Sequence, residues 1–227
     1  MKQLIKNIPL LGPLARALKQ RLFPAEAFTT SEAYWLHRYA QGGNSGAGSY
    51  HNLAEFKATV LNQFVAEHGI KTVLELGCGD GNQLRYFRFP AYTGFDISPV
   101  VIAQCQALFK DDPSKQFFLV GEAAGNQADL ALSLDVIYHL IEDDTYHAYM
   151  RSLFAAATSF VIIYSCDSDA PHNYAPHVRP RKFTTWVAQH RPDFRLLAHI
   201  PNQFPLEKGK TDSASTSFSE FFIYQKS

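Results

Sequence analysis

The stretch VLELGCGDGNQL, from Val73 to Leu84, decides how this chain is expected to fold. It opens with a short, mostly apolar run of the kind that is buried in a parallel sheet. Glycines then follow at positions 77, 79 and 81. Because glycine adopts backbone angles that other residues avoid, such a turn lets a ligand approach the main chain closely. The stretch therefore predicts a buried strand, a sharp turn and a helix start, whose free N–H groups can bind an anion.

The spacing of these glycines separates two kinds of nucleotide site. Dinucleotide-binding folds carry G-x-G-x-x-G after the first strand, whereas this turn reads G-C-G-D-G and has Glu75 two residues before its first glycine. An acid at that place suits a ligand with positive charge better than a pyrophosphate. An NAD-dependent oxidoreductase stays open as an alternative, but the spacing and Glu75 both speak against it.

A second glycine-rich run, GGNSGAGSY, spans residues 42–50. A P-loop needs a lysine followed by Ser or Thr after its last glycine, because the lysine reaches the terminal phosphates. Ser49 stands where that lysine would be, and the run lies between two helical patterns rather than between a strand and a helix. The run is therefore not expected to hold a nucleoside triphosphate.

Short apolar runs alternate with helical patterns along the rest of the chain. The expected strands are 72–76, 92–96, 116–120, 129–134, 160–164, 194–200 and 218–224. The expected helices are 29–40, 53–65, 82–87, 99–109, 143–157 and 183–190, the first with Thr29 and Glu32 at capping-box spacing. This alternation predicts a doubly wound α/β fold with a mostly parallel sheet and an N-terminal helical extension.

Composition limits the class of partner. The 21 basic and 21 acidic residues cancel, which argues against a general nucleic-acid-binding protein. Three cysteines without C-x-x-C spacing indicate neither a zinc site nor a disulfide framework, so a reducing cytoplasm is expected. Residues 1–23 combine basic side chains with an apolar helical stripe and contain no acid. They are expected to make peripheral contact with an anionic membrane or, alternatively, to pack on the domain or on a partner chain.

The stretch VLELGCGDG resembles motif I of the class I S-adenosylmethionine-dependent methyltransferases, and the resemblance extends from Lys71 to Ile163. Asp96 closes the second expected strand, as does the ribose-binding acid of that family. The segment LALSLDVIYHLIEDD is similar to the one after the fourth strand in the small-molecule branch. The resemblance implies a Rossmann-like sheet with a reversed C-terminal hairpin, and S-adenosylmethionine as the cofactor. It also implies a methyltransferase domain over residues 53–227, preceded by a helical extension and lid over residues 1–52.

The resemblance implies which residues hold the methionine and ribose parts of the cofactor. The amino-acid end would lie over Gly77, Cys78 and Gly79, with Glu75 below them. Asp96 would accept two hydrogen bonds from the ribose hydroxyls.

At the adenine ring, the resemblance implies flanking contacts from Ile97 and from the loop near residues 121–123, in which Glu122 or another loop residue would accept from the amino group. The glycine-rich run of residues 42–50 is expected to be a flexible lid over the methionine end, or else a plain linker between helices. As a lid it would place Ser45, Ser49 or Tyr50 where they could hydrogen-bond the ligand or exclude water.

A hydroxyl acceptor needs a base, which is worth roughly 10²–10⁴ in rate. His139 is the first candidate because it follows the strand 129–134, and the alternative is a structural role as a helix cap or packed ring. His177 lies on a later loop where acceptors enter. That loop also carries Arg179, Arg181 and Lys182, which suit an anionic acceptor or are simply solvated.

The function expected from these residues is methyl transfer to a small molecule, at oxygen, with a glycan or glycolipid precursor as the guess for the acceptor. No metal is expected, although Asp135, Asp167 and Asp169 follow strands four and five. No nucleic-acid partner is expected, since LDVIYH stands where base methyltransferases carry N-P-P-Y. A non-catalytic scaffold stays as a second alternative, disfavoured by the intact motif.

Overall fold

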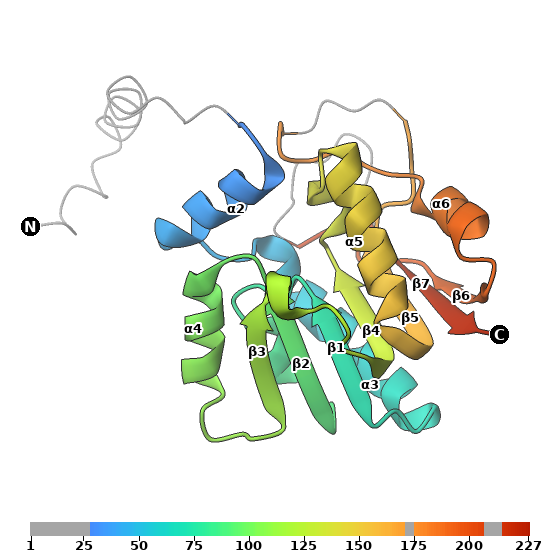
Figure 1. Cartoon of the computed structure of the whole chain (residues 1–227), viewed down its shortest axis with the longest axis horizontal. Helices are drawn as coiled ribbons and strands as arrows, with labels where there is room; N and C mark the ends of the chain where they lie inside the picture. Colours follow the sequence, from blue (N-terminus) through green and yellow to red (C-terminus); the bar gives the residue numbers. More distant parts are fainter. Residues whose placement is uncertain (1–27, 171–174, 207–214) are drawn as a thin grey trace, which may run out of the picture.

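The computed structural model describes residues 28–170, 175–206 and 215–227. Its centre is a seven-stranded sheet in the order β3-β2-β1-β4-β5-β7-β6 (Figure 1). Neighbouring strands pair in parallel from β3 to β5, whereas β7 runs antiparallel to both β5 and β6. The strands are β1 (Thr72–Leu76), β2 (Ala91–Asp96), β3 (Lys115–Leu119), β4 (Ala128–Leu134), β5 (Ala157–Ser165), β6 (Phe194–Ile200) and β7 (Glu220–Lys226). The predicted doubly wound sheet with a reversed C-terminal hairpin is confirmed.

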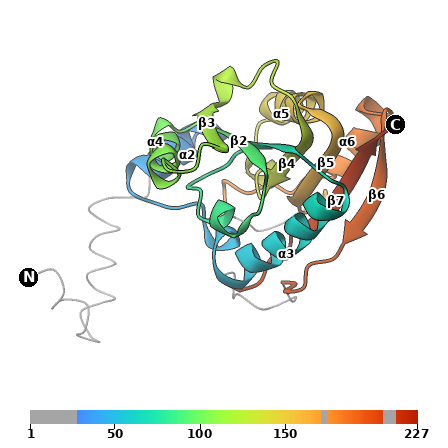
Figure 2. The same cartoon turned by 90° about the horizontal axis from the view of Figure 1, so that it is seen from below.

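Helices cover both faces of this sheet (Figures 1 and 2). One core contains apolar residues of α3 (His51–Glu67) and α4 (Pro99–Leu108), and the other contains residues of α5 (Asp143–Ala155) and α6 (Phe183–His190). The remaining helix, α2 (Ser31–Ala40), lies across the carboxyl ends of the central strands (Figure 1). The N-terminal helical extension is thereby confirmed, and it covers the edge of the sheet where ligands of such folds bind.

Strand β1 shows how the sheet divides the two cores. Successive side chains of a strand point to opposite faces, so Val73 packs in the core of α3 while Leu74 and Leu76 pack in the core of α5. Glu75 shares the face of Val73 and is only 1% exposed. A carboxylate therefore lies inside the layer between the sheet and α3.

The helix expected at residues 82–87 is shorter than predicted. The chain makes a 3₁₀ turn, Gln83–Tyr86, and is extended again at Phe87. Phe87 and Phe89 are both buried in the core beside Tyr92, with the rings of Phe87 and Phe89 4.9 Å apart. Burial of these rings draws the chain back to the sheet before a full helix can form.

The N-terminal boundary of α2 also differs from the expectation. The capping residue is Thr30 rather than Thr29, because Thr30 Oγ1 accepts from the N–H of Ala33 at 3.1 Å. Strand β7 begins at Glu220, two residues later than predicted.

The basic amphipathic segment expected at residues 1–23 lies outside the described residues. Within the described ranges, none of the helices combines the length and the apolar character that crossing a membrane requires.

Candidate active site

A cavity of about 910 Å³ opens at the carboxyl ends of β1, β2 and β4. Its walls come from the glycine turn after β1, from the ends of β2 and β4, from α2 above, and from α5. This is the place where open α/β sheets bind their ligands, because the strand order reverses here: β2 and β3 lie on one side of β1, and β4 and β5 lie on the other. Of the residues predicted for the site, those that line it are Ser49, Gly77, Cys78, Gly79, Asp96, Ile97 and His139.

The glycine turn forms a close-fitting cradle. Gly77 and Gly79 have φ angles of +86° and +58°. A Cβ on Gly79 would lie 2.3 Å from Ser45 Oγ, and one on Gly77 would lie 2.5 Å from Val136 Cγ2. The N–H groups of Gly77 and Cys78 donate to the Phe95 carbonyl at 2.7 and 3.0 Å, which holds the turn against β2. Larger residues at these glycines would fill the cavity floor or displace the lid.

Asp96 closes β2 with its carboxylate at the cavity wall. Its Oδ2 accepts from the N–H of Gly79 and its Oδ1 from the N–H of Ser98, each at 3.0 Å. A carboxylate oxygen can accept more than one hydrogen bond, so both oxygens keep capacity for a pair of hydroxyl donors. Burial raises the pKa of Asp96, and the two backbone donors oppose this effect.

Glu75 lies behind the cradle rather than in the cavity lining. The hydroxyl of Tyr92 donates to its Oε2 at 2.5 Å, and Gln83 Nε2 donates to its Oε1 at 3.3 Å. Burial raises the pKa of Glu75 to about 7, although the hydrogen bond from Tyr92 and the charge of Lys57 work in the opposite direction. Any effect of this carboxylate on a ligand is therefore transmitted through its neighbours.

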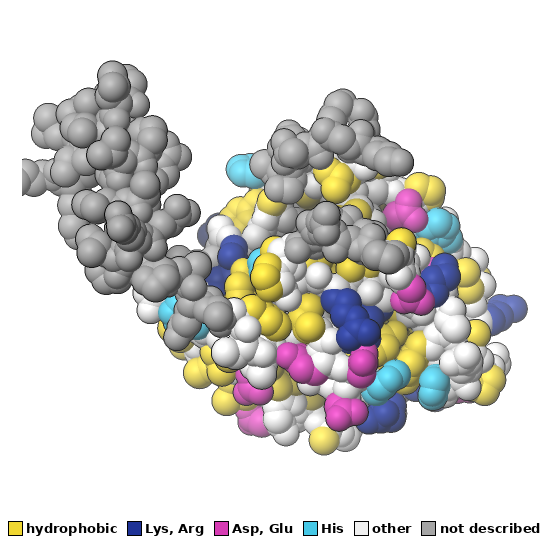
Figure 3. Space-filling view, turned by 90° about the horizontal axis from the view of Figure 1, so that it is seen from above, with side chains coloured by type: hydrophobic (Ala, Val, Ile, Leu, Met, Phe, Trp, Pro, Cys, Tyr) yellow, Lys and Arg dark blue, Asp and Glu magenta, His cyan; other side chains and the backbone are white. Residues whose placement is uncertain are grey.

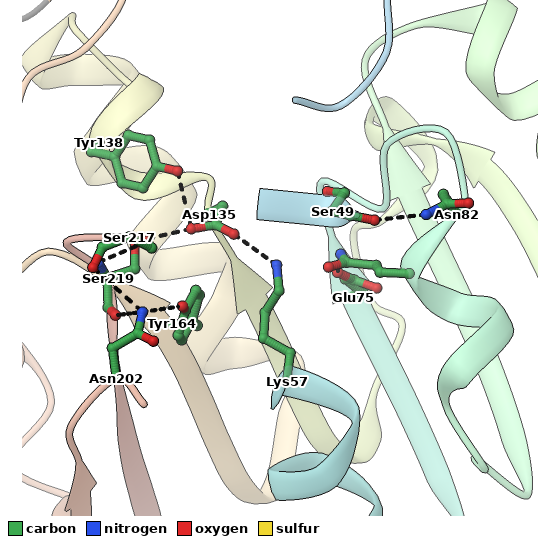
Figure 4. A network of polar contacts seen from close by, with 11 residues as sticks. Ser49, Lys57, Glu75, Asn82, Asp135, Tyr138, Tyr164, Asn202, Ser217 and Ser219 are labelled. Carbon is green, nitrogen blue, oxygen red and sulfur yellow. Dashed lines mark hydrogen bonds and ion pairs between the residues drawn. The ribbon is translucent and has the colours of Figure 1, made fainter. Parts of the chain in front are cut away.

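A buried ion pair lies beside the cavity and was not predicted from the sequence (Figure 4). Lys57 Nζ is 2.7 Å from Asp135 Oδ2, and the Lys57 side chain is fully buried. Tyr138 and Ser219 donate their hydroxyls to Asp135 Oδ1 at 3.0 and 2.9 Å. Asp135 lines the cavity and has a left-handed φ of +60°. A lysine on the apolar stripe of the helix 53–65, four residues from Leu61, was the signal that could have found this pair.

The glycine-rich run of residues 42–50 is bonded to the cradle. Asp80 Oδ2 accepts from the N–H of Ser45 at 2.9 Å and from the hydroxyl of Tyr50 at 2.8 Å, and Ser45 Oγ accepts from the Asp80 N–H at 2.8 Å. Ser49 lines the cavity, and its carbonyl accepts from Asn82 Nδ2 at 2.8 Å. Tyr50 is committed to Asp80 and is not part of the cavity lining. The run is therefore anchored over the cavity, and of its three residues predicted to face a ligand, Ser45 and Ser49 line the cavity whereas Tyr50 does not.

The first turn of α2 is anchored in a similar way at the other side of the cavity. The N–H of Ser31 donates to Glu142 Oε1, and the Ser31 hydroxyl accepts from the N–H of Ile141, both at 2.9 Å. Between its two anchors, α2 contributes Glu32, Trp35 and Tyr39 to the cavity lining.

The two predicted catalytic histidines are adjacent, but only one of them reaches the cavity. His139 lines it, and its Nδ1 is 2.8 Å from the main-chain carbonyl of His177. The ring of His177 instead stacks on Tyr34 at a centroid distance of 4.1 Å, with its Nε2 3.2 Å from the Tyr34 hydroxyl. His177 thus contacts His139 through its main-chain carbonyl and through its ring, whose centroid lies 5.5 Å from that of His139, and the same ring helps to hold α2.

Two further expectations concern Glu122 and the basic loop. Glu122 Oε1 accepts from the N–H of Leu119 at 3.0 Å, and Glu122 is not in the cavity lining, so the structure does not bring it to an adenine site. Arg181 is 7% exposed, bonds to Asp143 and donates to the Leu140 carbonyl at 2.8 Å.

The other basic residues of that loop also form ion pairs. Arg179 forms an ion pair with Asp143 at 3.1 Å, and Lys182 with Asp167 at 2.7 Å. On the face in Figure 3, Lys and Arg side chains lie beside Asp and Glu rather than gathering into one basic area. The part of the loop that is described therefore offers little unpaired positive charge for an anionic acceptor.

Most of the chain matches one family. A model of the methyltransferase domain matches residues 14–206, so the chain belongs to the methyltransferase domain family. This match confirms the resemblance to the class I S-adenosylmethionine-dependent methyltransferases, and it does not favour the oxidoreductase alternative. None of the curated proteins matches the sequence.

Solved structures share the fold at low sequence identity. Magnesium protoporphyrin IX methyltransferase from Synechocystis PCC 6803 with bound S-adenosylmethionine has a TM-score of 0.59 and 14% identity, over 89% of this chain and 100% of that chain. N-methyltransferase NodS from Bradyrhizobium japonicum WM9 with S-adenosylhomocysteine has a TM-score of 0.59 and 13% identity, over 76% and 85%. The small RNA methyltransferase HEN1 has a TM-score of 0.58 and 13% identity, over 78% and 26%. Their names differ in substrate, so the shared fold leaves the acceptor undecided.

The residues of the cavity fit S-adenosylmethionine. Asp96 supplies two acceptor oxygens for a ribose, the glycine cradle lies where a main chain must approach a ligand, and the carboxylates of Glu75, Asp96 and Asp135 favour a cationic group. When bound, the cofactor supplies a methyl group already activated by its sulfonium charge.

Replacing Asp96 by Ala is expected to weaken S-adenosylhomocysteine binding by at least roughly 10-fold, because hydrogen bonds to a charged group are worth about 1.5–3 kcal/mol each. Isothermal titration calorimetry measures the affinity. Asp112→Ala is the control, since Asp112 is paired with Lys115 outside the cavity lining. Unchanged affinity in Asp96→Ala would show that the ribose is bound elsewhere.

Glu75→Gln is expected to make the protein more stable at neutral pH. Because the pKa of Glu75 rises from 4.5 to about 7 on folding, the stability that its protonated form contributes is complete below about pH 4.5 and is lost as the pH passes through about 7. The free energy of unfolding of the wild type should fall by about 3 kcal/mol relative to Glu75→Gln between pH 4.5 and 8. Urea denaturation at several pH values measures this free energy. If it changes with pH in the same way in the two proteins, the raised pKa is contradicted.

Lys57→Met is expected to destabilise the fold by about 3–5 kcal/mol, because it leaves the Asp135 carboxylate without its buried counter-charge. The double variant Lys57→Met with Asp135→Asn should recover part of that loss. Exposed Lys110→Met serves as the control. Chemical denaturation gives the free energies of unfolding of the wild type, the two single variants and the double variant. If the effects of the two substitutions simply add, the pair does not interact.

Proposed function

We propose that this methyltransferase transfers the methyl group of S-adenosylmethionine to a hydroxyl oxygen of a small polar molecule, and that a glycan or glycolipid precursor is the acceptor. The cytoplasmic location and the membrane contact of residues 1–23 belong to the same proposal, since they would bring the enzyme to a lipid-linked substrate.

The observation that carries the proposal is the protonation state of the His139 ring. A carbonyl oxygen only accepts hydrogen bonds, so the 2.8 Å contact with the His177 carbonyl requires the proton of the ring to be on Nδ1. Nε2 then carries a lone pair. Burial lowers the pKa of His139 to about 4, so the ring is neutral at physiological pH and available as a proton acceptor.

A neutral proton acceptor at the cavity wall suits a hydroxyl substrate. The hydroxyl proton becomes strongly acidic as its oxygen gains the methyl group, so even an imidazole of low pKa can take it. The chain must also hold the acceptor oxygen in line with the bond that breaks, at about 3–3.5 Å, and keep water out. Ser45 and Ser49 of the glycine-rich run, together with Trp35 and Tyr39 of α2, cover the cavity and are placed to exclude it.

The side chains of α2 support a sugar-like acceptor. Trp35 lines the cavity next to His139, with ring centroids 4.8 Å apart, and Glu32 lines the same wall. An aromatic ring offers a flat apolar surface to a sugar ring, and a carboxylate accepts hydrogen bonds from its hydroxyls. The pairing of Arg181 and Lys182 with acidic residues gives no particular support to an anionic acceptor.

The test is a transfer assay with labelled S-adenosylmethionine against panels of sugars and lipid-linked sugars, phenols, amines and short RNA. Label on a sugar hydroxyl would support the proposal. Label confined to amines or to RNA would refute the oxygen acceptor, and wild-type protein that fails to bind S-adenosylhomocysteine would refute methyl transfer altogether.

His139→Ala is expected to lower kcat by roughly 10²–10⁴ with an accepted substrate, because it removes the proton acceptor. S-adenosylhomocysteine affinity should change little. His177→Ala is the matched comparison, since it keeps the main-chain carbonyl that orients His139 and should lose much less activity. Equal losses in the two variants would assign both histidines to holding α2 in place.

A further inference from the structure

Gln83 has an acceptor atom for which the described residues provide no partner. Its Oε1 is buried and makes no hydrogen bond, and the residue is 4% exposed. Gln83 is also part of the cavity lining. An unmet acceptor that is buried costs about 1–3 kcal/mol, so its position at a ligand cavity calls for a donor that arrives with the ligand.

The orientation of this amide is fixed by its neighbour. Glu75 is almost fully buried, and its carboxylate needs donors; it receives the Tyr92 hydroxyl at 2.5 Å and Gln83 Nε2 at 3.3 Å. When Glu75 is ionised, turning the amide around would set Gln83 Oε1 against a carboxylate oxygen and lose that bond. The NH₂ group therefore stays on Glu75, and the carbonyl oxygen is left for the cavity.

The position of Gln83 along the cavity indicates which part of the ligand lies next to it. The residue follows the glycine turn in the 3₁₀ turn Gln83–Tyr86 and bonds to β1 just before that turn. The adenine side is formed instead by residues after β2 and β3, such as Ile97 and Val120. Gln83 therefore lies at the methionine end, where a cofactor of this class offers a single strong donor, its α-ammonium group.

We propose that Gln83 Oε1 is the acceptor for the α-ammonium group of the cofactor, with Glu75 behind it as a positioning residue that orients and polarises the amide. The inference rests on the proposed function, because it needs S-adenosylmethionine or its product in the cavity. In this arrangement the negative charge of Glu75 reaches the ammonium group through a neutral amide. The carboxylate itself stays out of the cavity and does not repel the ligand's own carboxylate.

The test compares two ligands and two proteins. The ligands are S-adenosylhomocysteine and its analogue with hydrogen in place of the α-amino group, and calorimetry measures their affinities for the wild type and for Gln83→Met. Methionine has the length of glutamine but no amide oxygen. Gln83→Met should bind S-adenosylhomocysteine roughly 10- to 100-fold more weakly, whereas its affinity for the deaminated analogue should stay within about 3-fold of the wild type.

Gln106→Met is the matched control, because Gln106 donates to the Phe117 carbonyl at 3.0 Å and does not line the cavity. It should leave both affinities unchanged. If Gln83→Met fails to fold, Glu75→Gln takes its place: it removes the negative charge that polarises the Gln83 amide, so the preference for the amino-bearing ligand should shrink.

Equal losses for both ligands in Gln83→Met would overturn the proposal and assign Gln83 to packing alone, as would no loss for either. Failure of the proposed function has a different signature, because the wild type would then bind neither ligand.

Discussion

Buried negative charge at the carboxyl ends of three neighbouring strands is the constraint on which the rest of this site depends. Glu75 lies on β1, Asp96 closes β2, and Asp135 follows β4. Lys57 of α3 is the cation that contacts one of them, with its ammonium 2.7 Å from Asp135. Charges taken out of water are costly unless they are paired. Among the described residues, Glu75 and Asp96 form no ion pair and burial raises the pKa of both, so a cationic ligand would favour their charged forms.

The same principle explains how distant parts of the chain are joined around the cavity. Asp80 holds the glycine-rich run of residues 42–50, and Glu142 holds the first turn of α2. Asp135 joins α3 through Lys57 and the segment before β7 through Ser219. Each carboxylate satisfies donors from segments far apart in sequence, so these polar bonds hold the glycine-rich run, α2 and α3 in place around the cavity.

Glu75 illustrates the conflict between stability and function. Its burial raises its pKa to about 7, so its charged form weakens the fold at neutral pH. Asp135 has a left-handed backbone beside the same cavity, which is unfavourable for a residue other than glycine. Costs of this kind are typical of binding sites, where residues are selected for the ligand rather than for stability.

The sequence by itself determined the sheet, because buried parallel strands are short apolar runs and the glycine turn after Leu76 has few alternatives. The resemblance to motif I and to the ribose-binding acid of the family also placed the glycine cradle and Asp96 at the site, and both line the cavity. Only the tertiary structure decided that Tyr50 bonds to Asp80, that Lys57 is buried against Asp135, and that Gln83 presents an unmet acceptor. The physical reason is that a side chain's hydrogen-bond partners come from segments distant in sequence, and which donors meet which acceptors is settled only when those segments pack together.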